Sequence, residues 1–269
     1  MSGIIKKTFI PMAFGKIAIM ESGNPNAPAV ILSHSILSSS MMWEEQLGLL
    51  ANSGWRAIAI DTRGHGQTTP TQPPYTLMDL GLDVIAVLDF LEIDKAHFVG
   101  LSLGGMIGFS LGIHHGDRLH SLCICDARAD APPPVFNQWT ERMNIAKQQG
   151  CMALALPTIE RWFGKTFLES NPQIASSFAA TISNTSLNGY CGCAMAIQQM
   201  SFLDQLKDIK TRTTLIVGSN DLPLPETMKD IQSRIPGSIL ELIQDAGHLS
   251  NIDQPTAFNA ALLRHLTVR

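Results

Sequence analysis

The sequence predicts an α/β protein whose mostly parallel, doubly wound sheet carries a helical cap insertion. Short apolar runs without polar–apolar alternation occur in both halves of the chain, which is typical of strands buried on both faces of a parallel sheet. Helical patterns separate these runs. A stretch without strand patterns interrupts the alternation, so we expect a core formed by residues 1–128 and 207–269 and a cap formed by residues 129–206.

The first half of the chain contains predicted strands at residues 7–12, 16–20, 29–32, 57–60 and 96–99. Between the last two, one apolar helical stripe is formed by Leu80, Val84, Val87, Leu88 and Leu91. Thr76 is followed three residues later by Asp79, which resembles a capping box, so we expect the helix to begin there.

The second half of the chain begins with a predicted strand at 119–125. Three consecutive prolines at 132–134 follow, and the cap after them is expected to be helical. The alternation resumes with strands at 214–217 and 238–243, a helix near 225–235 and a final helix from about Pro255.

The composition indicates a globular protein that works without nucleic acid or a membrane. Of its 269 residues, 45% are hydrophobic, and the net charge of −4 argues against the basic surface that phosphate binding needs. The uncharged stretches 98–116 and 171–203 contain too many glycines or polar residues for a membrane span. The segment from Met1 to Lys7 contains two lysines and no apolar run, so we expect no secretory signal and a cytoplasmic location.

The cysteines are odd in number and have no C-x-x-C spacing; they are Cys123, Cys125, Cys151, Cys191 and Cys193. This pattern predicts neither a disulfide framework nor a zinc site. We therefore expect free thiols, no metal ion and no cofactor, and the pattern gives no oligomeric state.

Gly100-Leu101-Ser102-Leu103-Gly104 has the Gly-x-Ser-x-Gly pattern of a nucleophile elbow. A β run leads into it and a helical run leads out, which is the context that the pattern requires. Such a turn presents the serine hydroxyl at the carboxyl edge of the sheet. The sequence therefore predicts that Ser102 is a nucleophile.

A serine hydroxyl needs a base to take up its proton. His248 lies between the last predicted strand and the last helix, in a loop that can reach Ser102. Asp221 follows the 214–217 strand and completes the chain order Ser, Asp, His, so we favour it as the acid that orients His248. Asp126, which follows the strand before the cap, is its rival for this role.

Ester cleavage also needs two N–H donors for the negative charge that develops on the carbonyl oxygen. The backbone N–H of Leu103, directly after the nucleophile, is the first candidate. We expect the second donor to lie in the loop at residues 33–36 after the third strand, and we favour the backbone N–H of Ile36.

Four motifs together make nearly the whole chain resemble the α/β-hydrolase family with a helical cap: the Ser102 elbow, Asp61-Thr62-Arg63-Gly64-His65-Gly66, Gly218-x-x-Asp221 and Gly247-His248. Within this family the chain is most similar to 3-oxoadipate enol-lactonases. The likeness extends to residues 249–255 and to the cap motifs Trp139-x-x-Arg142, Glu160-Arg161-Trp162-Phe163 and Gly189-Tyr190-Cys191-Gly192-Cys193-Ala194. It implies a cytoplasmic enzyme of aromatic catabolism whose substrate carries a carboxylate.

Two positions depart from the family pattern. The oxyanion loop reads His34-Ser35-Ile36-Leu37, where the wider family often has His-Gly and the lactonases often have Asn-Ser-Leu-Gly. Asp126 stands where a neutral residue is expected. Both departures concern the substrate and leave the expected reaction unchanged. In the 61–66 turn, Arg63 is expected to have a structural role.

The uncharged 171–203 stretch is expected to roof the pocket, with methionines as an adaptable wall. A substrate carboxylate would be matched by a guanidinium, for which Arg128, Arg142 and Arg161 are available. The predicted substrate contacts are Trp139, Arg128, Arg161, Trp162 and Met195.

Three functions compete at this point. The leading hypothesis is hydrolysis of a small-molecule lactone or carboxylic ester through an acyl-serine. A C–C bond hydrolase or a cofactor-free, haloperoxidase-like perhydrolase would use the same triad, and a non-catalytic ligand sensor would use the same fold. Ser102 argues against dehalogenases and epoxide hydrolases of this fold, because they use a carboxylate nucleophile. Turnover of a panel of ester, lactone and diketone substrates would discriminate among these hypotheses.

Overall fold

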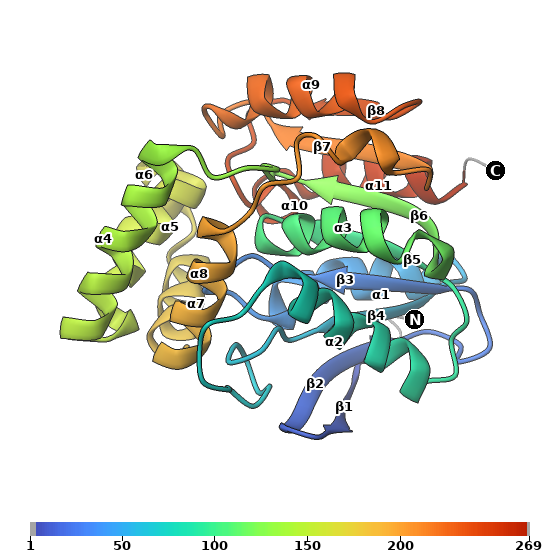
Figure 1. Cartoon of the computed structure of the whole chain (residues 1–269), viewed down its shortest axis with the longest axis horizontal. Helices are drawn as coiled ribbons and strands as arrows, with labels where there is room; N and C mark the ends of the chain where they lie inside the picture. The colour runs from blue at the N-terminus through green and yellow to red at the C-terminus, as the bar shows by residue number, and fades with distance from the viewer. Residues whose placement is uncertain (1–3, 268–269) are drawn as a thin grey trace.

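A computed structural model describes residues 4–267, within which eight strands form one sheet (Figure 1). The first three residues of the Met1–Lys7 segment lie outside this range. The strands are β1 (Lys6–Met12), β2 (Gly15–Ser22), β3 (Ala29–Ser33), β4 (Arg56–Ile60), β5 (Ala96–Leu101), β6 (Leu119–Cys125), β7 (Thr213–Gly218) and β8 (Ile239–Ile243). Every one of them was predicted, with bounds within about two residues, because a buried apolar run is a strong local signal.

The sheet has the strand order β1-β2-β4-β3-β5-β6-β7-β8. Strand β2 runs antiparallel to both of its neighbours, and the pairs from β4 to β8 are all parallel. At its centre, Ile31 of β3 pairs with Ile58 of β4 and Phe98 of β5. Every residue of β3 is buried, which explains why this strand shows no alternation. The predicted mostly parallel, doubly wound sheet is confirmed.

Helices cover both faces of the sheet. Figure 1 shows α1 (Glu44–Asn52) and α11 (Pro255–Thr267) behind it and α2 (Leu77–Phe90) and α3 (Leu103–His114) in front. The remaining core helices are α9 (Leu224–Arg234), packed on β7 and β8, and the short α10 (Ser250–Asp253). Helix α2 begins with the predicted capping box, in which the Thr76 side chain and the Asp79 carboxylate bond to each other's backbone N–H.

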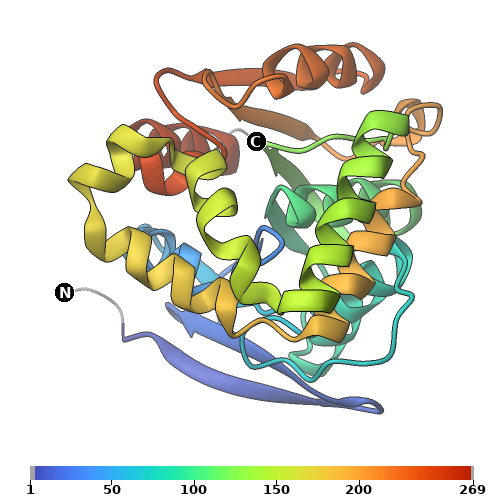
Figure 2. The same ribbon diagram turned by 90° about the vertical axis from the view of Figure 1, so that its left-hand side faces the viewer.

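The chain between β6 and β7 forms the cap. Its helices are α4 (Pro133–Gln149), α5 (Ala155–Phe163), α6 (Lys165–Ser170), α7 (Pro172–Ser183) and α8 (Leu187–Gln198), and all of them fall within the predicted 129–206 segment. Figure 2 shows them gathered in front of the carboxyl ends of the parallel strands. The cap therefore lies over the sheet edge at which the predicted catalytic residues meet.

The two uncharged stretches are divided among short elements. Residues 98–116 contain the end of β5, the elbow and α3, and residues 171–203 contain α7 and α8. Among residues 4–267, no helix combines the length and the apolar character that crossing a membrane requires.

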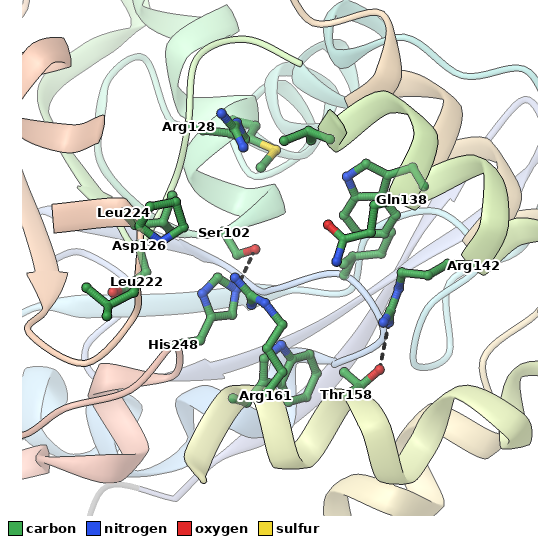
Figure 3. A pocket seen from close by; sticks show the side chains of 16 residues that line it. Ser102, Asp126, Arg128, Gln138, Arg142, Thr158, Arg161, Leu222, Leu224 and His248 are labelled. Atoms are coloured by element: carbon green, nitrogen blue, oxygen red, sulfur yellow. Dashed lines mark hydrogen bonds between the residues drawn. The ribbon is translucent and has the colours of Figure 1, made fainter. Parts of the chain in front are cut away.

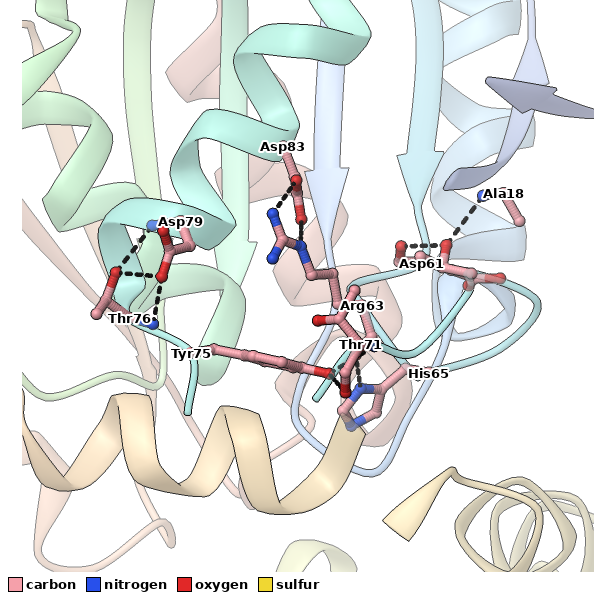
Figure 4. A network of polar contacts seen from close by, with 10 residues as sticks. Ala18, Asp61, Arg63, His65, Thr71, Tyr75, Thr76, Asp79 and Asp83 are labelled. Carbon is pink, nitrogen blue, oxygen red and sulfur yellow. Dashed lines mark hydrogen bonds and ion pairs between the residues drawn. The ribbon is translucent and has the colours of Figure 1, made fainter. Parts of the chain in front are cut away.

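The turn at residues 61–66 is fixed from two sides (Figure 4). Arg63 donates two hydrogen bonds to Asp83 of α2, at 2.6 and 2.8 Å, which is the bidentate geometry that guanidinium and carboxylate groups favour. The Asp61 carboxylate accepts the backbone N–H groups of Ser40 and Gln67 at 2.7 and 2.9 Å. Arg63 thus has the structural role expected for it.

Candidate active site

Ser102 lies in a strained turn between β5 and α3. Its φ and ψ angles are 56° and −112°, which a non-glycine residue adopts only where the surrounding structure imposes them. A Cβ on Gly100 would lie 2.2 Å from the Gly104 carbonyl oxygen, and a Cβ on Gly104 would lie 2.1 Å from the Ser33 carbonyl oxygen. Glycine is therefore required on both sides of Ser102, and this is the physical basis of the elbow pattern.

Ser102, His248 and Asp221 form a continuous hydrogen-bonded chain. The Ser102 Oγ lies 2.9 Å from the His248 Nε2, and the His248 Nδ1 lies 2.6 Å from the Asp221 Oδ2. These residues are 6%, 5% and 4% exposed, respectively. Figure 3 shows the bonded Ser102–His248 pair at the wall of a cavity. The three predicted residues thus have the geometry of a Ser–His–Asp triad.

The cap contacts the histidine loop directly. The His248 N–H donates to the Trp162 carbonyl oxygen of α5 at 2.8 Å, and the two rings stack at 24° with centroids 6.4 Å apart. A Cβ on Gly247 would lie 2.3 Å from the same carbonyl oxygen, so glycine permits this approach. The position of His248 therefore depends on α5 as well as on the core.

Asp126, the rival acid, has other partners. Its Oδ1 accepts the Gly218 N–H at 2.8 Å, and its Oδ2 lies 2.6 Å from the Ser250 Oγ. Complete burial raises the pKa of Asp126 well above its usual value, and the nearby Asp221 raises it further. The carboxylate that contacts His248 is that of Asp221, as the chain order predicts.

Of the two predicted oxyanion donors, Leu103 directly follows the nucleophile and Ile36 lines the same cavity as Ser102. Among the described residues, neither the Ile36 N–H nor the Leu103 N–H donates a hydrogen bond. The Gly104 N–H donates to the His34 carbonyl oxygen at 3.1 Å, which attaches the Ile36 loop to the elbow helix. The His34 ring bonds to the Ser35 carbonyl through Nδ1 and accepts the Thr62 N–H through Nε2. Burial lowers the pKa of His34, so the neutral ring holds this loop in place.

A cavity of about 280 Å³ opens beside Ser102 and His248. The core lines it with Ile36, Met106, Asp126 and Arg128 and with the 222–224 turn. The cap contributes α4 and α5, through Val135, Gln138, Trp139, Arg142, Thr158, Arg161 and Trp162. This volume is at the lower end of small-molecule sites, and the mixture of apolar walls with a few polar groups is typical of them.

Four of the five predicted substrate contacts line this cavity: Trp139, Arg128, Arg161 and Trp162. The prediction for Met195 is wrong, because Met195 does not line it and instead packs against the hydrophobic core from α8. The expectation that residues 171–203 roof the pocket is also wrong. Helices α4 and α5 line the cavity instead; α7 packs against α5, and α8 packs between α4 and the core helices α2 and α3.

Local sequence patterns provide only weak signals for the other lining residues. Arg142 follows Trp139 by three positions, so both lie on one face of α4, and this pair was visible as the Trp139-x-x-Arg142 motif. Gln138 and Thr158 had no local signal, because a polar residue on an amphipathic helix usually faces solvent.

The three pocket arginines differ in their partners. Arg128 donates to the Asp130 carbonyl oxygen and lies 3.5 Å from its carboxylate, and Arg161 lies 3.4 Å from the Asp221 Oδ1. Arg142 donates to the Thr158 hydroxyl at 2.7 Å, and no carboxylate among residues 4–267 forms an ion pair with it. Arg142 is thus the pocket cation without an anionic partner in the described structure.

The five cysteines are free and buried, as expected. Within residues 4–267, no group of three or more His, Cys, Asp or Glu side chains is arranged to hold a metal ion.

Comparison with known proteins agrees with this geometry. The family model for the alpha/beta hydrolase fold matches residues 28–255. 3-Oxoadipate enol-lactonase 2 of Acinetobacter baylyi is 33% identical over 243 residues, which make up 89% of each chain. A hydrolase from Pseudomonas aeruginosa PA01 superimposes with a TM-score of 0.92 at 33% identity, covering 98% of this chain and 99% of that one.

The enol-lactonase from Burkholderia xenovorans LB400 also superimposes with a TM-score of 0.92, at 30% identity, covering 97% of this chain and all of the other. The resemblance to enol-lactonases that the cap motifs suggested is therefore confirmed. The family match, the sequence identities and the shared fold show that the chain belongs to the α/β-hydrolase family.

Proposed function

We propose that the protein is a serine hydrolase that cleaves a small lactone or carboxylic ester through an acyl-serine intermediate. The observation that carries this proposal is the hydrogen-bonded chain from the Ser102 Oγ through His248 to Asp221 at the wall of a small cavity. The similarity to an enol-lactonase of known structure supports the same substrate class.

In the first half-reaction, His248 takes the Ser102 proton at Nε2 while Oγ attacks the carbonyl carbon. The N–H groups of Ile36 and Leu103 stabilise the oxyanion, each by about 10²–10³ in rate. The C–O bond then breaks, and His248 returns the proton to the leaving oxygen. In a lactone this oxygen stays tethered to the acyl chain, so the whole substrate remains bound to Ser102.

In the second half-reaction, His248 removes a proton from water, which attacks the acyl-serine carbonyl carbon. The tetrahedral intermediate collapses, the bond to Oγ breaks, and Ser102 recovers its proton from His248. The product is a carboxylate with a hydroxyl group, or with a ketone where the leaving oxygen was enolic. Asp221 accepts the hydrogen bond from the His248 Nδ1 and stabilises the imidazolium that forms twice in each cycle.

We further propose that the substrate carries a carboxylate and that Arg142 binds it. Burial raises the pKa of the neighbouring Tyr190 to about 12, against the opposing effect of Arg142, so Tyr190 stays neutral and cannot serve as the anion. Arg142 also lies over the Trp139 ring, 5.6 Å from its centroid. This contact and the hydrogen bond to Thr158 together orient the planar guanidinium group. Arg128 and Arg161 are weaker candidates, because each already lies beside an aspartate.

The buried, free cysteines support a reducing compartment, and we propose a cytoplasmic enzyme that acts on a small molecule. The enol-lactonase likeness favours a role in aromatic catabolism. The competing hypotheses predict different products: a C–C hydrolase would consume a diketone, a perhydrolase would form a peracid, and a sensor would bind without turnover.

Ser102→Ala tests the proposal. We expect turnover of lactone and ester substrates to fall by about 10⁴–10⁶ in a folded protein, because no nucleophile remains. A fluorophosphonate should label the unmutated protein at Ser102 alone. Ser22→Ala is a matched control, because Ser22 is buried in β2 and its hydroxyl has no partner among the described residues. Labelling at another residue, or near-normal turnover in Ser102→Ala, would contradict the mechanism.

A further inference from the structure

Asp126 lies at the point where the three catalytic segments meet. It follows β6 directly, is 0% exposed, and has a φ angle of 46°, in the left-handed region. Its N–H donates to the Ile216 carbonyl oxygen of β7 at 2.9 Å. The carbonyl oxygen of the preceding Cys125 accepts the Ser102 N–H at 2.8 Å. The backbone around Asp126 therefore joins the elbow to β7.

The Asp126 side chain joins the other two segments. The Gly218 N–H that donates to Oδ1 belongs to the turn that carries Asp221, and the Asp221 N–H in turn bonds to the Gly218 carbonyl oxygen at 3.2 Å. Ser250, whose hydroxyl bonds to Oδ2, stands two residues after His248. One buried carboxyl group thus connects the turn that carries Asp221 with the loop that carries His248.

We propose that Asp126 is a positioning residue, whose carboxyl group holds the Asp221 turn and the His248 loop at the separation that their hydrogen bond requires. This inference rests on the proposed function, because it assumes that His248 and Asp221 act as a base–acid pair. Asp126 does not touch the reacting atoms of that pair, and its effect passes through Gly218 and Ser250.

The charges around Asp126 favour its neutral form. Asp221 faces it from the turn after β7, Arg161 from α5, and the Cys125 thiol from β6, while His248 and Arg128 share the cavity wall. Burial and the Asp221 carboxylate raise the pKa of Asp126 further than Arg161 lowers it. A neutral carboxyl group still makes both bonds, since Oδ1 accepts from Gly218 and the Oδ2 hydroxyl donates to Ser250.

This protonation state makes asparagine the matched substitute. A carboxamide has the same shape, accepts through Oδ1 and donates through Nδ2, so Asp126→Asn keeps the bonds to Gly218 and Ser250. Alanine removes both bonds. We expect kcat of Asp126→Asn to stay within about threefold of the unmutated enzyme, and kcat of Asp126→Ala to fall by about 10- to 100-fold. KM should change by less than about twofold in both variants, because Asp126 is 0% exposed and therefore contributes almost no surface to the cavity that it borders.

Ser250→Ala removes the hydrogen bond between Asp126 and the His248 loop from the Ser250 side. It should lower kcat by about 3- to 10-fold, and Asp126→Ala/Ser250→Ala should be no slower than Asp126→Ala alone, because both changes remove one shared link. The rate of Ser102 labelling by a fluorophosphonate should fall in parallel with kcat, since it depends on the same activation of the nucleophile.

Glu21→Ala is the control for destabilisation. It breaks the partly buried ion pair with Arg56, which lies at the start of β4 and so at the sheet edge opposite the triad. It should lower the melting temperature while leaving kcat within about twofold. Asp126→Ala with unchanged kcat and labelling rate, Asp126→Asn as slow as Asp126→Ala, or multiplicative effects of Asp126→Ala and Ser250→Ala would each overturn the positioning role.

If Asp126→Ala does not fold, Ser250→Ala decides: unchanged kcat and labelling rate in that variant overturn the proposal. Failure of the proposed function has a different signature, which is turnover that survives in Ser102→Ala. Unchanged rates in the Asp126 and Ser250 variants, with activity lost in Ser102→Ala, would overturn the positioning role and leave the hydrolase in place.

Discussion

At the scale of single residues, the two aspartates near the triad differ in what surrounds them. Asp221 accepts from His248 and lies beside Arg161, whereas Asp126 is hydrogen-bonded to a backbone N–H and a hydroxyl in a fully buried site. Sequence position alone left both as candidates, because each follows a parallel strand and precedes the histidine. The direction in which each carboxyl group points distinguishes them, and that depends on tertiary contacts.

Asp221→Asn should lower kcat by about 10³–10⁴, because an amide neither fixes the reactive tautomer of His248 nor stabilises its charged form. Steady-state kinetics on one ester substrate measure the effect, with circular dichroism to verify folding. A loss below about tenfold would mean that another group orients His248.

Arg142→Gln should remove any preference for substrates that carry a carboxylate. In the unmutated enzyme, we expect kcat/KM for a lactone with a carboxylate tail to exceed that for its methyl ester by more than about tenfold, or about 1.4 kcal/mol. The variant should bring this ratio close to one and change kcat/KM for the neutral ester by less than about threefold.

Arg128→Gln is the matched control for this measurement. Its guanidinium lies beside Asp130, so its removal should leave most of the preference intact. Equal rates for charged and neutral substrates in the unmutated enzyme would refute a carboxylate site, and the protein would then be an esterase for neutral acyl groups.

At the scale of elements, close packing of backbone on backbone determines the elbow. Gly104→Ala should destabilise the protein by at least about 3 kcal/mol and abolish activity, because its Cβ would meet the Ser33 carbonyl oxygen, which cannot move without displacing β3.

Gly48→Ala makes the same chemical change in α1, where no atom lies within 4 Å of the added carbon. It should stabilise the protein by about 0.5–1 kcal/mol, since alanine favours the helix. Urea unfolding of both variants measures the contrast. A Gly104→Ala protein as stable as Gly48→Ala would mean that the elbow adapts more easily than its geometry indicates.

The sequence predicted elements far better than it predicted the pocket. Strands such as Ala29–Ser33 are buried on both faces and read as continuous apolar runs, so their local pattern determines them. The cavity wall depends on which cap helix faces the core. Helices α4 and α8 both present apolar residues, and only their packing places Trp139 in the cavity and Met195 outside it.

At the scale of the whole molecule, buried titratable groups give stability a defined pH dependence. Burial lowers the pKa of His65 and of His265 to about 3. Between about pH 6.5 and 3, these histidines are therefore protonated in the unfolded chain and neutral in the folded chain. Each of these histidines then costs about 1.4 kcal/mol of stability per pH unit as the pH falls. Asp126 acts with the opposite sign, because its raised pKa makes the folded chain hold a proton that the unfolded chain releases above about pH 4.

Two variants should therefore change the pH slope in opposite directions. Between pH 6 and pH 5, His265→Gln should make the free energy of unfolding less dependent on pH, by about 1.4 kcal/mol per unit. Asp126→Asn should make this pH dependence steeper by a similar amount, because asparagine does not titrate and the opposing contribution of Asp126 is lost. Urea titrations at pH 5, 5.5 and 6 measure the slopes, and parallel curves for all three proteins would show that these side chains titrate alike in both states.

The hydrogen bond from the His248 N–H to the Trp162 carbonyl oxygen has a consequence for protein engineering. Because α5 bears on the catalytic histidine itself, this helix is a poor place to diversify, and random changes there would alter rate and selectivity together. Helix α4 reaches the same cavity through Val135, Gln138, Trp139 and Arg142, yet contributes nothing to the triad. A combinatorial library confined to those four positions should shift substrate choice while preserving the reaction, so α4 is the segment to exchange when grafting new specificities onto this scaffold.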